Sequence, residues 1–137
     1  LARRLAARGD AVWIIGSEGD GTIGEQIARE SEGAAINLCG KTDLASAIDL
    51  MSVARLVVSN DSGLMHVAAA LGKPLVALYG SSSPEHTPPL ADSARIVRIE
   101  GLACSPCYKR ECPLGHFRCM NELTPEHILG QIEDIGL

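Results

Sequence analysis

The chain has 137 residues, the length of about one domain, and its 12 Lys and Arg against 17 Asp and Glu give a net charge of −5. This balance provides no broad basic surface, so nucleic acid is not expected as a partner. Hydrophobic residues at 46% and charged residues at 21% exclude a mainly disordered chain. No apolar run reaches the roughly 18 residues of a membrane-spanning helix and no signal peptide opens the chain, so the expected compartment is the cytosol.

The first residues predict the last turns of a helix that Gly9 ends, and no Met precedes them. We therefore expect the chain to be a fragment of a longer protein. Up to Tyr79, short apolar runs alternate with helical patterns. Strands are predicted at 11–15, 34–38, 55–59 and 75–79, and helices at 22–31, from 43, and at 62–71. This alternation predicts a doubly wound parallel α/β sheet, in which the run 11–15 is buried on both faces.

The remainder of the chain is less regular. A turn-rich loop at 81–89 precedes a predicted strand at 95–99, and a cysteine-rich irregular stretch fills 101–121. Thr124, a following Pro and an acidic residue then open a helix at 124–135. Its apolar residues share one face, so we expect this helix to pack back on the domain.

The strongest local pattern begins at Ser59, where a predicted strand passes directly into a helix. Ligands of open parallel sheets bind at this carboxyl edge. We expect Asp61 to cap the helix and Ser62 to offer a hydroxyl, while Gly63 lets a ligand approach the backbone amides. Those amides favour an anion such as a diphosphate, to which His66, one turn after Ser62, can donate. Ordinary helix capping and a surface histidine are the alternative.

Other loops follow predicted strands at the same edge. One contains Ser17 and Asp20, whose carboxylate is suited to ribose hydroxyls, and the next contains Gly40 and Thr42. We predict that these loops converge on one ligand, although plain loops explain them as well. Gly80–Ser83 offers a fourth contact or a simple turn. Neither a Gly-x-Gly-x-x-Gly fingerprint nor a Gly-Lys-Ser/Thr loop is present, so a nucleotide site of another kind remains open.

Four of the five cysteines form the pattern C-x2-C-x4-C-x6-C. They are Cys104, Cys107, Cys112 and Cys119, with Cys39 apart. Four thiolates at this spacing can hold a structural zinc, although the last pair is wider than the common C-x2-C knuckle. Reduced cysteines and a labile disulfide are the alternatives, whereas a disulfide framework does not fit a cytosolic chain.

Basic residues gather in the same stretch despite the acidic total. They are Lys109, Arg110, His116 and Arg118. This local charge suits an anionic sugar or a lipid headgroup, or marks only a solvated loop.

The stretch NDSGLMHVAAALGKPLVALYG at 60–80, with SSP at 82–84 and TPPL at 87–90, resembles the lipopolysaccharide heptosyltransferases of glycosyltransferase family 9. The heptosyltransferase II branch is the most similar. Asp-Ser-Gly-x-x-His is the most specific element, and the CSPCYKRECPL segment occurs in one branch of the family. The resemblance covers nearly the whole chain.

The resemblance implies a Rossmann-like sheet that forms the C-terminal, donor-binding half of a GT-B glycosyltransferase. Residues 1–137 would be one domain with a cysteine-rich insertion at about 101–121 and a closing helix at about 124–135. The N-terminal domain of the same chain would be missing. The donor would be ADP-L-glycero-D-manno-heptose, and the acceptor would be the lipopolysaccharide inner core at the cytoplasmic face of the inner membrane, with peripheral membrane contact.

The resemblance also implies roles for residues. Asp61, Ser62, Gly63 and His66 would hold the diphosphate and its sugar, Asp20 would meet the ribose, and the 38–42 loop would border the adenine. The inverting reaction needs no cofactor, although a structural zinc remains open. Its carboxylate base would lie in the N-terminal half, so no catalytic residue is expected here and the fragment would bind without turnover.

The sequence leaves alternatives to a heptosyltransferase II-like enzyme open. Another GT-B enzyme, either a different heptosyltransferase or a nucleotide-sugar 2-epimerase, also begins a helix at its phosphate site with Ser-Gly. A zinc-stabilised, non-catalytic binding module is a rival of a different class. The sequence supports a dinucleotide-dependent oxidoreductase less well, because the glycine fingerprint of that class is missing.

Overall fold

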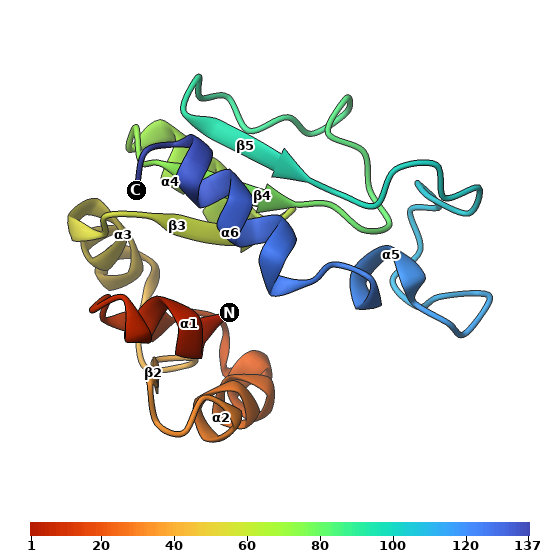
Figure 1. Cartoon of the computed structure of the whole chain (residues 1–137). Helices are drawn as coiled ribbons and strands as arrows, with labels where there is room; N and C mark the ends of the chain where they lie inside the picture. The colour runs from red at the N-terminus through yellow and green to blue at the C-terminus, as the bar shows by residue number, and fades with distance from the viewer. The chain divides into compact units, whose positions relative to one another are not determined.

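The computed structural model describes all residues from 1 to 137, and they form two compact units, Leu1–Leu50 and Met51–Leu137 (Figure 1). The first unit contains α1 (Ala2–Ala7), β1 (Val12–Ile14), the 3-10 helix η1 (Glu18–Asp20), α2 (Gly21–Glu30), β2 (Ala35–Asn37) and most of α3 (Leu44–Val53). The second contains β3 (Val57–Asn60), α4 (Gly63–Ala70), β4 (Leu75–Leu78), β5 (Ala94–Val97), α5 (Arg118–Asn121) and α6 (Pro125–Asp134). No helix is both long and apolar enough to cross a membrane.

The first unit is built on a parallel pair of strands, β1 and β2. Both α1 and α2 contact this pair, and α2 approaches β2 closely because Gly24 has no side chain. The expectation that the first strand is buried on both faces is wrong. Trp13 is 37% exposed and its register partner Ile36 is 54% exposed. Because the two residues are register partners, they lie on the same face of the pair, and this face is therefore partly uncovered.

The second unit is built on three parallel strands in the order β3-β4-β5. Leu75 and Val76 of β4 point to opposite faces and both are inaccessible to solvent, so both faces of this central strand are covered. The closing helix α6 contacts β4 and β5, and its buried residues are Ile128 and Ile132 (Figure 1). The prediction that the last helix packs back on the sheet is therefore confirmed.

The strands do not form the single hydrogen-bonded layer that the alternation suggested. They pair as β1-β2 and as β3-β4-β5, all in parallel. The predicted fold class is thus confirmed in strand direction and helix alternation, while the layer is divided into two sheets.

Candidate functional site

The turn from β3 into α4 has the features of an anion-binding helix start. The Asp61 N–H donates to the carbonyl of Leu78 at 3.1 Å, which fixes the chain as it leaves the strand. Ser62 is the N-cap residue in extended conformation, but its side chain makes no capping hydrogen bond. The expectation that Asp61 caps the helix is therefore wrong. With no side-chain cap, the first-turn amides and the positive end of the helix dipole remain available to an anion.

Asp61 is held by a neighbour that sequence reasoning did not assign a role. Thr87 Oγ1 donates to the Asp61 carboxylate at 2.9 Å. Behind it, the hydroxyl of Tyr79 donates to the Thr87 carbonyl at 2.5 Å. Tyr79 is only 1% exposed, and its burial raises the pKa of the phenol, with the negative charge of Asp61 adding to the effect. The hydroxyl of Thr87 therefore orients the Asp61 carboxylate next to the N-cap residue Ser62.

Among the other residues at this helix start, Ser62 is half-buried, whereas Gly63 and His66 are exposed. Ser62 Oγ lies 3.2 Å from Ser59 Oγ, so the two hydroxyls share a hydrogen bond. A Cβ added at Gly63 would meet nothing within 4 Å, so a ligand can approach the amides there. His66 is exposed one helical turn later, on the face that Ser62 begins. The structure therefore brings Ser62, Gly63 and His66 together as predicted.

Within the first unit, the two predicted loops lie against each other. The Gly40 N–H donates to the Gly16 carbonyl at 3.0 Å. A Cβ at Gly40 would lie 2.9 Å from the Cα of Glu18, and Gly40 itself has a φ of +70°, so this contact requires glycine. The half-buried Thr42 follows on the same loop. The pairing of these loops at the carboxyl ends of β1 and β2 agrees with the prediction.

Asp20 already has protein partners. One of its carboxylate oxygens accepts the Ser17 hydroxyl at 2.6 Å and the Ser17 N–H at 2.8 Å. These two hydrogen bonds lower the pKa of Asp20, the side-chain bond most. The carboxylate is thus ionised and oriented at the rim of its loop. The convergence of this loop with the Asp61 turn on one ligand stays a prediction, because the two belong to different compact units.

The loop after β4 contacts the cysteine-rich segment. The Gly80 carbonyl accepts the Ser105 hydroxyl at 2.7 Å. The Ser81 carbonyl accepts the N–H groups of Cys107 and Tyr108 at 3.0 and 2.7 Å. A further bond of 2.5 Å joins His86 Nδ1 to the Tyr108 hydroxyl. These contacts place the 101–121 segment at the carboxyl end of β4.

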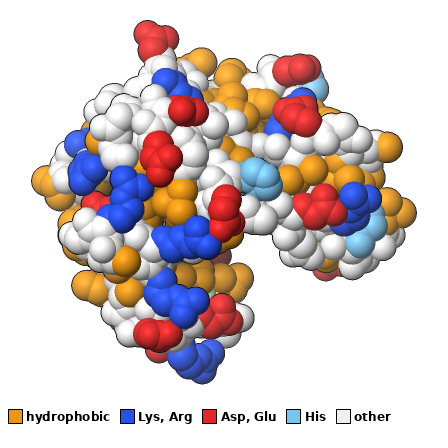
Figure 2. Space-filling view, in the orientation of Figure 1, with side chains coloured by type: hydrophobic (Ala, Val, Ile, Leu, Met, Phe, Trp, Pro, Cys, Tyr) orange, Lys and Arg blue, Asp and Glu red, His pale blue; other side chains and the backbone are white.

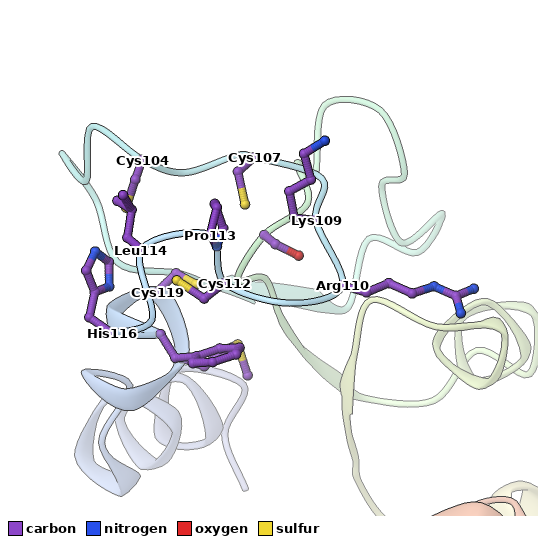
Figure 3. A pocket seen from close by; sticks show the side chains of 12 residues that line it. Cys104, Cys107, Lys109, Arg110, Cys112, Pro113, Leu114, His116 and Cys119 are labelled. Atoms are coloured by element: carbon purple, nitrogen blue, oxygen red, sulfur yellow. The ribbon is translucent and has the colours of Figure 1, made fainter.

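The four predicted metal ligands line one cavity, shown in Figure 3, in this same segment. They are Cys104, Cys107, Cys112 and Cys119, all as free thiols. Their present positions do not bring three or more His, Cys, Asp or Glu side chains into the close group that a bound ion needs. Cys39 is buried elsewhere, in the first unit, and burial raises the pKa of its thiol.

The basic residues of the segment do not form one anion-binding cluster. Lys109 and Arg110 line the cavity, but their charged ends point outward in Figure 3, and Arg118 pairs with Glu122. The space-filling view in Figure 2 likewise shows acidic and basic side chains interspersed on the visible face.

Parallel α/β architecture with an uncapped helix start at a strand's carboxyl end is the architecture of nucleotide- and phosphate-binding proteins. The family model described as glycosyltransferase family 9 (heptosyltransferase) matches residues 1–118, and the chain belongs to this family. The predicted family is thus confirmed. Membership argues against the non-catalytic zinc module and the dinucleotide oxidoreductase.

The names of individual relatives agree with the family match. The chain is 43% identical to lipooligosaccharide heptosyltransferase 2 of Haemophilus ducreyi and 39% identical to lipopolysaccharide heptosyltransferase 2 of Escherichia coli, over 98% and 100% of its length. It spans about 40% of the length of each relative.

Two solved structures share the fold. The structure of E. coli ADP-heptose lps heptosyltransferase II matches 98% of this chain and 38% of its own, with 37% identity and a TM-score of 0.81. A family 9 glycosyl transferase from Veillonella parvula matches over the same shares with a TM-score of 0.81 at 24% identity, which supports the fold alone. The predicted fold of one GT-B half is confirmed by the first match.

Proposed function

We propose that this chain is the donor-binding domain of a heptosyltransferase II-like enzyme, which transfers L-glycero-D-manno-heptose from ADP-heptose to the lipopolysaccharide inner core with inversion. The observation that carries the proposal is the uncapped start of α4, flanked by Asp61 and His66, in a chain of family 9. Such a helix start is suited to the diphosphate of the donor. The relatives named heptosyltransferase 2 support the choice of sugar and acceptor.

The chemistry of each side chain indicates which part of the donor molecule it contacts. A carboxylate repels phosphate but accepts hydrogen bonds from hydroxyls, so we assign Asp61 to the heptose. Ser62, Gly63 and His66 are donors and are assigned to the diphosphate. When the bond between the heptose C1 and the phosphate oxygen breaks, negative charge collects on the departing ADP. Donors fixed before the reaction stabilise that charge at little reorganisation cost.

The loops of the first unit are assigned to the nucleoside. Ser17 fixes one carboxylate oxygen of Asp20, which leaves the other for the ribose hydroxyls. Gly40 and Thr42 are assigned to the adenine. This assignment requires residues 1–137 to act as one donor-binding domain in the full-length protein.

The catalytic base and the acceptor groove are assigned to the part of the enzyme outside these 137 residues. We assign the base that removes the proton of the acceptor hydroxyl to the N-terminal domain, together with the acceptor groove. The proposed partners are therefore ADP-heptose, the lipopolysaccharide inner core and that domain. The proposed place of action is the cytoplasm, at the inner face of the inner membrane.

Calorimetric titration of the full-length protein with ADP, UDP and NAD tests the proposal. We expect selective ADP binding that is strongly weakened in His66→Ala, since the histidine is assigned to the diphosphate. In the transfer assay, Asp61→Ala should lower turnover with ADP-heptose more than it lowers ADP affinity, because its assigned contact is to the sugar. Preferential binding of UDP or NAD, or unchanged ADP affinity in a folded His66→Ala variant, would refute the proposed site.

A further inference from the structure

The segment 101–121 has little regular structure and no fully buried side chain of its own. Its regular structure is the four-residue helix α5, and Leu114 and Phe117 are exposed at 62% and 43%. Two of its non-glycine residues, Tyr108 and Phe117, have φ values of +56° and +48°. Such backbone conformations persist only where the surroundings impose them. Segments with so small a core are usually stabilised by a metal or by disulfides.

The four thiols of the segment lie around a common space. Cys104, Cys107 and Cys112 come from the irregular part of the segment and Cys119 from α5, and all four line the cavity of Figure 3. The sulfur of Cys107 points toward the centre of the group in that view, where the sulfurs of Cys112 and Cys119 are also drawn. The cationic ends of Lys109 and Arg110 project outward, so the thiols form the inner lining.

Backbone amides surround the sulfur of Cys112. They are the N–H groups of Phe117, Leu114, His116 and Gly115, in the turn that follows this residue. A neutral thiol is a weak acceptor, whereas a metal-bound thiolate is stabilised by several amide donors. The turn after Cys112 therefore suits a sulfur that binds a metal.

Four thiolates around one cavity repel one another unless a cation lies among them. A divalent ion removes this repulsion and accepts four thiolates in tetrahedral geometry.

We propose that Cys104, Cys107, Cys112 and Cys119 bind one Zn²⁺ and that this ion holds the 101–121 segment against the carboxyl end of β4. Binding replaces the four thiol protons, which pass to solvent, by four sulfur–zinc bonds. A zinc with four thiolates carries a charge of −2, and the backbone amides around Cys112 stabilise this charge. Since the present sulfur positions are not yet a closed ligand set, the thiols move inward around the ion.

The position of the site gives it a structural role. A Cβ added at Gly80 would lie 2.5 Å from Met120 Sδ and 3.5 Å from Cys119 Sγ, so this end of the segment packs directly on the strand end. Cys107 is joined to the Ser81 carbonyl by its N–H. The ion would thus fix two attachment points of the segment at once.

Metal analysis of the full-length protein tests the site without any assay of activity. The protein carries no histidine tag, is expressed with added zinc and is purified in metal-free reducing buffer. We expect about one zinc per chain by mass spectrometry. Cobalt substitution should give the sulfur-to-metal charge-transfer band and the strong visible absorption of a tetrahedral thiolate site.

Two variants and one titration complete the test. Cys112→Ser combined with Cys119→Ser should lose the zinc, whereas Cys39→Ser should retain it because Cys39 lies outside the cavity. If the double variant does not fold, an organomercurial added to the wild type should release one zinc per chain to a chromogenic chelator. Wild-type protein without stoichiometric zinc, cysteines oxidised to disulfides, or zinc retained in the double variant would each overturn the proposal.

Discussion

Thr87 connects the start of α4 to the loop after β4, because its hydroxyl binds the Asp61 carboxylate. Thr87→Val keeps the shape of the side chain and removes this donor. One hydrogen bond to a charged group contributes about 1.5–3 kcal/mol, so we expect ADP-heptose affinity to fall roughly tenfold or more as Asp61 loses its orientation. Calorimetry on the full-length protein measures this.

The matched control for that variant is Ser93→Ala. It also removes one side-chain hydrogen bond, from the Ser93 hydroxyl to the Lys73 carbonyl, but far along the chain from the helix start. It should bind ADP-heptose like the wild type. Equal affinities of Thr87→Val and Ser93→Ala would show that Thr87 does not position Asp61.

Gly24 is required by the contact between α2 and β2. A Cβ at this position would lie 2.3 Å from Asn37 Oδ1 and 2.9 Å from Cys39 Sγ. Gly24→Ala should therefore destabilise the chain by about 1–3 kcal/mol, although alanine is the better helix former. Gly21→Ala, in the same helix with nothing within 4 Å, should be neutral or slightly stabilising in urea unfolding. Equal effects of the two would contradict the packing argument.

The ionisation of Asp20 depends on Ser17, whose side-chain and backbone hydrogen bonds lower the pKa of this carboxyl. A lowered folded-state pKa means that the stabilisation is present above the unfolded-state pKa and is lost as pH falls through the folded value. Ser17→Ala keeps the amide and removes the hydroxyl, so the pKa of Asp20 should rise toward its ordinary value in an NMR titration. The pKa of Asp43, lowered by Ser46, should stay unchanged. If the pKa of Asp20 does not change in Ser17→Ala, the Ser17 hydroxyl is not the cause of its lowered value.

The residues of the site could be predicted only in part. Spacing alone placed Ser62, Gly63 and His66 on one helix start, because a helix repeats over short distances in the sequence. The partner of Asp61 could not be found this way. Thr87 lies 26 residues away on an irregular loop, and only the tertiary fold brings the two together.

At the scale of elements, α6 stabilises the second unit through Ile128 and Ile132, which are 6% and 2% exposed. Ile132→Ala should cost about 2–5 kcal/mol, because it leaves a cavity against the sheet. Ile23→Ala, at a position 60% exposed in α2, should change the stability by no more than about 0.5 kcal/mol. Urea unfolding compares the two. A small effect at Ile132 would mean that α6 is not docked on the sheet in solution.

Elements were predictable where the pattern was long and periodic. The predicted helices at 22–31, 62–71 and 124–135 differ from α2, α4 and α6 by one residue at each end. The short α5 was missed, because its four residues are too few to show a helical repeat. The burial of β1 was overestimated, since an apolar run does not reveal which faces of its sheet other elements will cover.

At the scale of the whole molecule, the buried core is unevenly divided. Of the buried apolar residues, only Ala35, Cys39 and Ala47 belong to the first unit, whereas the second includes the large side chains of Tyr79, Met65, Leu75 and Ile132. Burial of apolar area is the main stabilising contribution to folding. The sequence pattern did not reveal this division, because it shows which residues are apolar and not which of them find partners.

This division predicts two levels of stability within the 137-residue chain. Trp13, its only tryptophan, reports on the first unit and is already 37% exposed, so its fluorescence should change at a lower urea concentration than the circular dichroism of the whole chain. Amide exchange should likewise be faster at Trp13 and Ile36 than at Val76 and Ala77, which are inaccessible to solvent. If the fluorescence and circular dichroism transitions coincide and the four amides are equally protected from exchange, the two units unfold together. The smaller core of the first unit would then not determine its stability.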